Sequence, residues 1–363
     1  FLELVDGKFG KHVDQVSEGA EIIDYSGYSI APGLVDTHIH GFGGVDVMDN
    51  NIEGTLHTMS EGLLSTGVTS FLPTTLTSSY EQLLAVTENI GARYQEATGA
   101  KIRGIYFEGP YFTEKYKGAQ NPAYMKDPRM DEFRAWQKAA NGLLNKIALA
   151  PEREGVEDFV RTITGEGVTV ALGHSNATFD EAKKAVDAGA SVWVHAYNGM
   201  RGLTHRELGM VGAMYELPHT YAELICDGHH VDPKACDILL KQKGTENIAL
   251  ITDCMTAGGL DDGDYMLGEF SVVVANGTAR LKSTGNLAGS ILKLKDGLKN
   301  VVEWGIANPH EAVMMVSLNP AKSVHIDDVC GQIREGYDAD FIVLDKDLEL
   351  VATYLDGVKR YQA

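Results

Sequence analysis

Residues 168–186 of this chain read VTVALGHSNATFDEAKKAV. The first part, from Val168 to Leu172, is almost entirely apolar, which is typical of a strand that is covered on both faces. The last part, from Phe179 to Val186, has apolar residues at the spacing of an amphipathic helix. We therefore predict a buried strand, a short loop that carries His174, and a helix that packs against the strand.

The same unit of strand and helix recurs between residues 33 and 253. One of the helices, residues 234–244, is preceded by Asp232 as an N-cap and by Pro233 in the first turn. Eight such units favour a closed (β/α)8 barrel, a TIM-like α/β fold, over an open sheet. The strands are expected at residues 33–40, 67–76, 102–108, 146–151, 168–175, 191–198, 221–227 and 247–253.

Both ends of the chain depart from this pattern and carry only strand and turn signals. Neither end alone could build a core, so residues 1–30 and 331–363 are expected to pair into one small β-sandwich domain. The barrel domain then spans residues 31–330. Within it, the glycine-rich residues 258–289 predict a β-hairpin inserted after the eighth strand, where loops shape a substrate site.

The composition of the 363 residues excludes several classes of protein. A hydrophobic fraction of 44% and a charged fraction of 23% indicate a folded core. Acidic residues outnumber basic ones 51 to 31, and a net charge of −20 argues against nucleic acid or an anionic membrane as a partner. No apolar run is long enough to span a bilayer. The four cysteines form no CxxC pair and indicate a reducing compartment, so we expect a cytoplasmic protein.

Histidines and acidic residues mark the ends of several predicted strands. His38 and His40 end the first strand, and because a strand alternates faces their side chains point the same way. A barrel brings the carboxyl ends of its strands to one mouth, and imidazole and carboxylate are common ligands of divalent transition metals. A single histidine at a strand end is usually structural, but a set at equivalent positions predicts a metal site. The set is His38, His40, Glu108, His174, His195 and Asp253, with at most one of His229 and His230 from the loop after strand seven.

Other chemistries lack their residues in this sequence. No Gly-x-Ser-x-Gly elbow and no P-loop are present, which argues against a covalent serine mechanism and against nucleotide chemistry. Lys146 is the only lysine near the fourth strand that could become a carboxylated bridge between metal ions. It lies at the start of that strand, on the wrong side of the barrel, so we predict Glu108 as the bridge.

Residues 31–41, APGLVDTHIHG, resemble the opening of the amidohydrolase superfamily. Later motifs, in the same order over essentially the whole chain, narrow the resemblance to the N-acetylglucosamine-6-phosphate deacetylase family. They are EGP at 108–110, KGAQNP at 117–122, GHSNA at 173–177, HAYNGM at 195–200, DGHHV at 227–231, TDCM at 252–255 and LAGS at 287–290.

The resemblance implies a role for each matching residue. Asp253 would be the general base and acid, and His230 would contact the sugar and the acetamide. Gln120 stands where many relatives carry His. The main metal would be bound by Glu108, His174 and His195, with His38 and His40 available for a second ion. Substrate contacts would come from Ala119, Gln120, Asn198, Gly199, Arg206, His230, Leu287, Ala288 and Gly289, with Asn198, Gly199 and Arg206 at the sugar phosphate.

The implied activity is hydrolysis of the acetamide of N-acetylglucosamine 6-phosphate to glucosamine 6-phosphate and acetate. An unactivated amide needs a strong nucleophile and a polarised carbonyl, and one or two divalent ions per chain, zinc, iron or similar, would supply both. The expected partner is a small amino-sugar phosphate, and the expected assembly is a homodimer. Three alternatives stay open: the galactosamine epimer as substrate, a cyclic-amide hydrolase, and a non-catalytic scaffold. The scaffold would have lost metal ligands, and none of the expected ones is lost.

Overall fold

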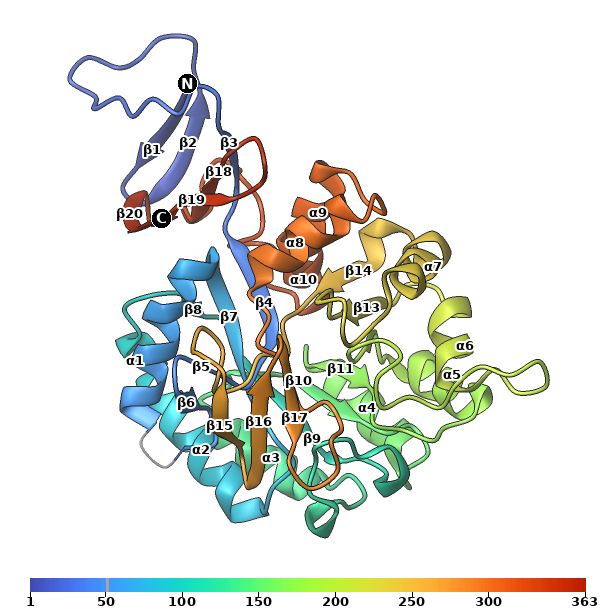
Figure 1. Cartoon of the computed structure of the whole chain (residues 1–363). Coiled ribbons are helices and arrows are strands. Elements are labelled where there is room, and N and C mark those ends of the chain that lie inside the picture. Colours follow the sequence, from blue (N-terminus) through green and yellow to red (C-terminus); the bar gives the residue numbers. More distant parts are fainter. Residues whose placement is uncertain (50–51) are drawn as a thin grey trace.

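Eight parallel strands form the centre of the computed structural model, which describes residues 1–49 and 52–363 (Figure 1). They lie in the order β14-β13-β12-β11-β10-β9-β7-β4. The first and last strands of this order meet where the backbone N–H of Asp253 donates to the carbonyl of His38 at 2.9 Å and Ile39 pairs with Cys254. The predicted (β/α)8 barrel is therefore confirmed. The strands are β4 (Leu34–Ile39), β7 (Val68–Thr75), β9 (Ile105–Tyr111), β10 (Leu144–Leu149), β11 (Thr169–Leu172), β12 (Val192–Trp193), β13 (Tyr221–Leu224) and β14 (Ile248–Leu250), with β8 (Lys101–Ile102) beside β7.

Helices cover the outside of the barrel (Figure 1). All residues of β4, β7 and β9 are buried, as the apolar runs predict for strands between helices and a filled interior. The helix predicted after residue 232 begins at Pro233, and the Asp232 carboxylate accepts the N–H of Lys234. The helices are α1 (Ile52–Leu63), α2 (Tyr80–Arg93), α3 (Met130–Ala139), α4 (Val156–Thr164), α5 (Phe179–Ala188), α6 (Gly209–Glu216), α7 (Pro233–Lys243), α8 (Leu294–Glu303), α9 (Pro309–Val316) and α10 (Leu318–Ser323).

The two ends of the chain lie together beside the barrel, where Figure 1 shows both termini. One antiparallel sheet has the order β20-β19-β18-β3 and the other pairs β1 with β2. Phe9 of the smaller sheet packs on Phe341 of the larger with ring centroids 6.1 Å apart. The small β-sandwich from both chain ends is thus confirmed, while its limits at residues 30 and 331 stay a prediction. The strands are β1 (Leu2–Val5), β2 (Lys8–His12), β3 (Ser29–Pro32), β18 (Phe341–Leu344), β19 (Leu350–Leu355) and β20 (Val358–Gln362).

A small antiparallel sheet follows the eighth barrel strand. It is formed by β15 (Gly263–Leu267), β16 (Phe270–Ala275) and β17 (Thr278–Leu281), one strand more than a hairpin requires. Its apolar side packs on Leu76 and Met255 at the barrel mouth. A short pair, β5 (Gly41–Phe42) and β6 (Val45–Asp46), follows β4 at the same end. These additions build up the walls of the mouth around the expected metal ligands.

Candidate metal centre

The six side chains expected at the metal site are all buried at the carboxyl ends of barrel strands. Each residue is at most 9% exposed. They are His38 in β4 and His40 just after it, Glu108 in β9, and His174, His195 and Asp253 after β11, β12 and β14.

The backbone is strained where three of these residues leave their strands. His174, His195 and Asp253 have positive φ angles of 45°, 28° and 50°. Each such residue costs about 1–3 kcal/mol, and this kind of strain is concentrated at functional sites. Gly199 has a φ of +62°, and a Cβ there would lie 3.0 Å from His174 Nδ1. Glycine at this position therefore lets the chain pass close to the His174 ring.

Glu108, His174 and His195 form the first ligand group. The Nε2 atoms of both histidines lie 3.1 Å from Glu108 Oε1 and 3.0 Å from each other. Two nitrogens and one oxygen at such spacing are a donor set typical of a zinc-like or iron-like ion.

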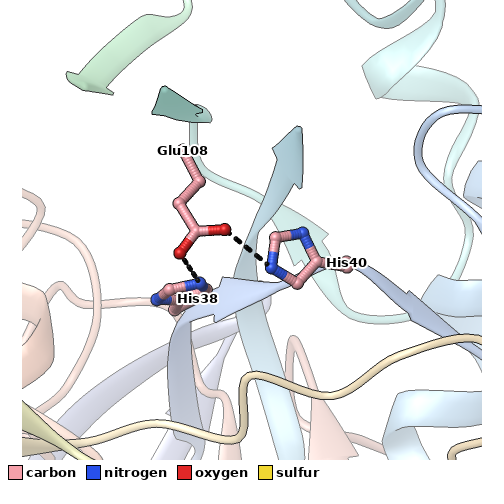
Figure 2. A group of neighbouring side chains, drawn as sticks. All are labelled: His38, His40 and Glu108. Atoms are coloured by element: carbon pink, nitrogen blue, oxygen red, sulfur yellow. Dashed lines mark ion pairs between the residues drawn. The ribbon is translucent and has the colours of Figure 1, made fainter. Parts of the chain in front are cut away.

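His38, His40 and Glu108 form a second ligand group, which shares the carboxylate of the first. Figure 2 shows the two rings on one side of that carboxylate. His38 Nε2 lies 3.5 Å from Glu108 Oε1, and His40 Nε2 lies 3.3 Å from Glu108 Oε2. Glu108 therefore lies between the two groups, as a bridging carboxylate would.

In each ring, the outer nitrogen Nδ1 points away from Glu108 and the inner nitrogen Nε2 points toward it. The hydrogen bonds of Nδ1 show that Nε2 is free to bind a cation. Nδ1 of His40 lies 3.1 Å from the carbonyl of Thr74, and those of His174 and His195 lie 2.9 and 3.0 Å from the carbonyls of Tyr116 and Asn198. Because a carbonyl can only accept, each Nδ1 carries a proton, and in the neutral ring Nε2 presents a lone pair.

The Nε2 lone pairs converge on the oxygens of Glu108. Lone pairs and carboxylate oxygens repel one another unless a cation lies between them. Nε2 of His38 is buried and has no hydrogen-bond partner in the described part of the chain. Without a metal ion, protons can supply the positive charge: burial lowers the pKa of His195, but contact with Glu108 outweighs it and raises the pKa to about 8. Both ligand groups thus fit a divalent metal ion.

Asp253 lies beside the second group, since the loop after β14 that carries it pairs with the end of β4. Its Oδ1 lies 3.1 Å from His40 Nε2 and 3.5 Å from His38 Nε2. Burial raises the pKa of Asp253, but the positive charge of the two histidines outweighs burial and lowers it. The side chain is 12% exposed, the most open of the acids at the centre, so it can reach a substrate.

Beneath the centre the barrel contains two charged residues, Lys146, which the sequence interpretation rejected as a bridge, and Glu223, which it missed. Glu223 of β13 contacts His38 Nδ1 through Oε2 at 3.1 Å and pairs with Lys146 through Oε1. Lys146 is the third residue of β10, inside the barrel, and belongs to neither ligand group in the described chain. Burial raises the pKa of Glu223, but Lys146 and His38 outweigh it and lower the pKa to about 2. The available signal was an acid in the middle of an otherwise apolar strand.

The sequence interpretation also missed Asp36, another buried acid in the middle of a strand, β4. Burial raises its pKa to about 7 despite the hydroxyl of Thr252, which donates to the carboxylate at 2.6 Å. This contact ties β4 to the loop that carries Asp253.

A cavity of about 240 Å³ opens over the metal ligands. His40, Glu108, His174, His195 and Asp253 are among the residues that line it. Arg206 is not among the lining residues and lies exposed in the loop before α6. A second cavity of about 570 Å³ adjoins it and shares Leu76 and Ala119. The predicted substrate residues that line the smaller cavity are Ala119, Gln120, Asn198, Gly199, His230, Leu287, Ala288 and Gly289.

Of the adjacent histidines after β13, only His230 lines this cavity. Its Nδ1 lies 2.6 Å from Oδ2 of Asp227, whose Oδ1 also accepts the backbone N–H groups of His229 and His230. Burial raises the pKa of Asp227, but its contacts with His230 outweigh burial and lower it. Asp227 therefore fixes the ring with its other nitrogen toward the cavity, whereas His229 is exposed.

Comparison with known proteins agrees with this geometry. Residues 29–360 match the Amidohydrolase family. The chain belongs to the amidohydrolase family. Over 98% of its length it is 39% identical to the N-acetylglucosamine-6-phosphate deacetylase of Vibrio furnissii, of which it covers 86%. Over 90% of its length it is 40% identical to the N-acetylgalactosamine-6-phosphate deacetylase of Escherichia coli O157:H7, again covering 86%.

A solved structure has the same fold as this amidohydrolase. It is a mutant N-acetyl-D-glucosamine-6-phosphate deacetylase from Mycobacterium smegmatis in complex with N-acetyl-D-glucosamine-6-phosphate, with a TM-score of 0.92 and 29% identity. The alignment covers 99% of this chain and 94% of the other. Among the described residues, no helix of this amidohydrolase is long and apolar enough to cross a membrane.

Proposed function

We propose that this amidohydrolase hydrolyses the acetamide of N-acetylglucosamine 6-phosphate to glucosamine 6-phosphate and acetate. The observation that carries the proposal is that Asp253, Glu108 and His195 line one cavity together with His230. A metal-ligand group, a carboxylate placed for proton transfer and a histidine facing the same space are what amide hydrolysis requires. The curated relatives narrow the substrate to an N-acetylated amino-sugar phosphate.

A divalent metal ion, when bound by these residues, supplies a polarised carbonyl and a water of lowered pKa. Glu108, His174 and His195 would hold one ion, and His38 and His40 with Glu108 would hold a second. Nitrogen and oxygen donors suit zinc, iron and similar divalent ions, and metal analysis of the purified protein identifies the bound ion.

Asp253 is the residue that we propose to move protons. Its carboxylate accepts a proton as a water oxygen forms the new bond to the carbonyl carbon. It then donates that proton to the nitrogen as the carbon–nitrogen bond breaks. The products are acetate and a primary amine, and the carboxylate returns to its starting state.

The cavity walls are proposed to bind the sugar. His230, oriented by the contact of its Nδ1 with Asp227, presents Nε2 to the cavity, where the neutral ring can accept a hydrogen bond from the acetamide N–H or from a ring hydroxyl. Asn198 and Gly199 both line the cavity. We place the phosphate beside them, with Arg206 of the loop before α6 as the proposed cation.

The test is acetate release from N-acetylglucosamine 6-phosphate, combined with metal analysis of the same sample. Turnover that is lost on chelation and restored by a divalent ion is expected. A sample that holds metal and releases no acetate from either hexosamine phosphate would overturn the proposal.

The galactosamine epimer is a second candidate substrate. The N-acetylgalactosamine-6-phosphate deacetylase is 40% identical to this chain, and the N-acetylglucosamine-6-phosphate deacetylase is 39% identical. The two sugars differ in the orientation of one hydroxyl group. Comparison of kcat/KM for both phosphates decides between them.

We further propose that the protein acts in the cytoplasm as a homodimer. Its four cysteines are all buried and unpaired, which agrees with a reducing compartment. Light scattering on the purified protein tests the assembly.

A further inference from the structure

A buried chain of polar contacts runs from the metal centre into the barrel interior. His38 Nδ1 lies 3.1 Å from Glu223 Oε2, and Glu223 Oε1 pairs with the ammonium group of Lys146. The side chains of all three residues are at most 1% exposed.

The partner of His38 differs from those of the other three histidines at the centre. His40, His174 and His195 have backbone carbonyls at Nδ1, whereas His38 has a carboxylate. A carboxylate at the outer nitrogen of a ligating histidine fixes the tautomer and the ring orientation, and it also raises the basicity of the inner nitrogen. The inner nitrogen of His38, Nε2, is also one of the buried polar side-chain atoms that have no hydrogen-bond partner among the described residues.

Stability alone does not explain the ion pair. A buried pair of charges must be dehydrated, and its replacement by apolar residues of similar size is often neutral or stabilising. Lys146 is itself fully satisfied: its ammonium group also donates to the carbonyl of Thr37 at 3.2 Å and lies 3.8 Å from the centroid of the Tyr106 ring. The two buried charges therefore indicate a role other than stability of the fold.

We propose that Glu223 is a positioning residue for His38, and that Lys146 keeps Glu223 charged and in place. Glu223 holds the ring with its Nε2 toward Glu108 and strengthens it as a ligand of the His38–His40–Glu108 group. The inference rests on the proposed function only in taking that group as a metal site. Oε2 of Glu223 also accepts the backbone N–H of His195 at 3.4 Å. The rings of His174 and His195, however, have backbone carbonyls at Nδ1, so only the ring of His38 is held by Glu223.

The experiment compares two double variants, so that no buried charge is left without a partner. Lys146→Met/Glu223→Leu removes both charges and the acceptor for His38 Nδ1. Lys146→Met/Glu223→Gln removes both charges but keeps an acceptor oxygen. The metal-free proteins are titrated with Zn²⁺ against a competing chelator, and melting temperatures are measured without metal. Asp187→Asn, an acid-to-amide change in an exposed ion pair with Lys183 on α5, is the control and should change neither zinc affinity nor melting temperature.

We expect the leucine double variant to keep its melting temperature and to bind one of two zinc ions about 10–100-fold more weakly. The glutamine double variant should lose less affinity, and the other ion should be unaffected in both. Wild-type affinity in both double variants would overturn the proposal, because the pair would then be structural. Equal losses in the two variants would overturn the positioning role, since only the charge would matter. Equal weakening of both ions would overturn the assignment to His38.

The proposed function is judged separately, because the titration contains no sugar. Acetate release by the wild-type enzyme can fail while the zinc result stands, and the reverse is equally possible.

Discussion

The side chains of Gln120 and Glu108 are joined by a hydrogen bond of 2.5 Å, in which the amide Nε2 donates to the carboxylate Oε2. The other end of the amide, Oε1, accepts the backbone N–H of Thr77 at 2.8 Å. Because a backbone N–H can only donate, the orientation of the amide is fixed and its NH2 group faces Glu108. Gln120 therefore restrains the carboxylate that both ligand groups share.

The variant Gln120→Ala is expected to weaken metal binding by about 10–100-fold, the usual effect of removing an outer partner of a ligand. It also leaves the buried N–H of Thr77 without an acceptor. Zinc titration against a chelator measures the effect. Gln120→His, which restores a ring N–H, should lose less affinity than the alanine variant. Unchanged affinity in Gln120→Ala would show that the histidines alone hold Glu108.

Asp253→Asn is expected to fold and to bind metal, because asparagine tolerates the φ of 50° at this position. An amide cannot take the proton of water, so kcat for acetate release should fall about 10²–10⁴-fold. Metal analysis of the same sample separates this effect from loss of the ion. Wild-type turnover in the variant would remove Asp253 from the mechanism.

Metal stoichiometry tests the second ligand group. His38→Ala/His40→Ala should reduce the content from two ions per chain to one, since Glu108, His174 and His195 remain. His12→Ala/His229→Ala removes two exposed histidines and serves as the matched control. If wild type and the His38/His40 variant bind one ion with equal affinity and activity, the second site does not exist.

The sequence was sufficient to predict the residues at the ends of strands. His38, Glu108, His174, His195 and Asp253 could be placed at one mouth because a parallel barrel aligns the carboxyl ends of its strands. That argument needs only the order of the strands and the position of each residue within its strand.

Residues in the middle of strands could not be placed in this way. Glu223 and Lys146 come from strands that are not neighbours in the sheet, and they meet across the barrel interior. Their contact depends on the stagger of the strands and on side-chain length, neither of which is encoded locally. Lys146 was therefore predicted to lie on the wrong side of the barrel, although its ammonium group reaches the residue that holds His38.

Asp338 gives the fold a predictable response to acid. Its carboxylate lies 2.9 Å from Lys101 and also pairs with Lys8 and Arg103, joining the barrel to the end sheets. Burial raises the pKa of Asp338, but these cations outweigh it and lower the pKa well below the usual value. A depressed carboxyl pKa stabilises the folded state above the unfolded pKa of about 3.9, and the stabilisation is lost as the pH falls below it.

Asp338→Asn should therefore lower the melting temperature near neutral pH, and its difference from wild type should shrink below about pH 4. The pKa of the neighbouring Asp340 is raised by burial, so that residue opposes the trend in both proteins. Asp347→Asn, in an exposed pair with Lys346, is the control and should change little. A difference that is independent of pH would assign the effect of Asp338 to packing.

Arg206 is expected to bind the sugar phosphate. No ion pair involves it in the described part of the chain, and the carboxylate of the adjacent Glu207 accepts the N–H groups of Phe179 and Gly209 instead. The protein carries a charge of −20, so an anionic substrate needs a local cation to approach the barrel mouth.

Arg206→Ala should raise KM for the 6-phosphate sugar by roughly tenfold or more, the value of a hydrogen bond to a charged group. KM for unphosphorylated N-acetylglucosamine should not change. Arg134 of α3 forms an exposed ion pair with Glu166, and Arg134→Ala removes an equal charge. This control variant should leave both KM values unaltered. Equal rises of KM for both sugars in Arg206→Ala would show that this arginine does not recognise the phosphate.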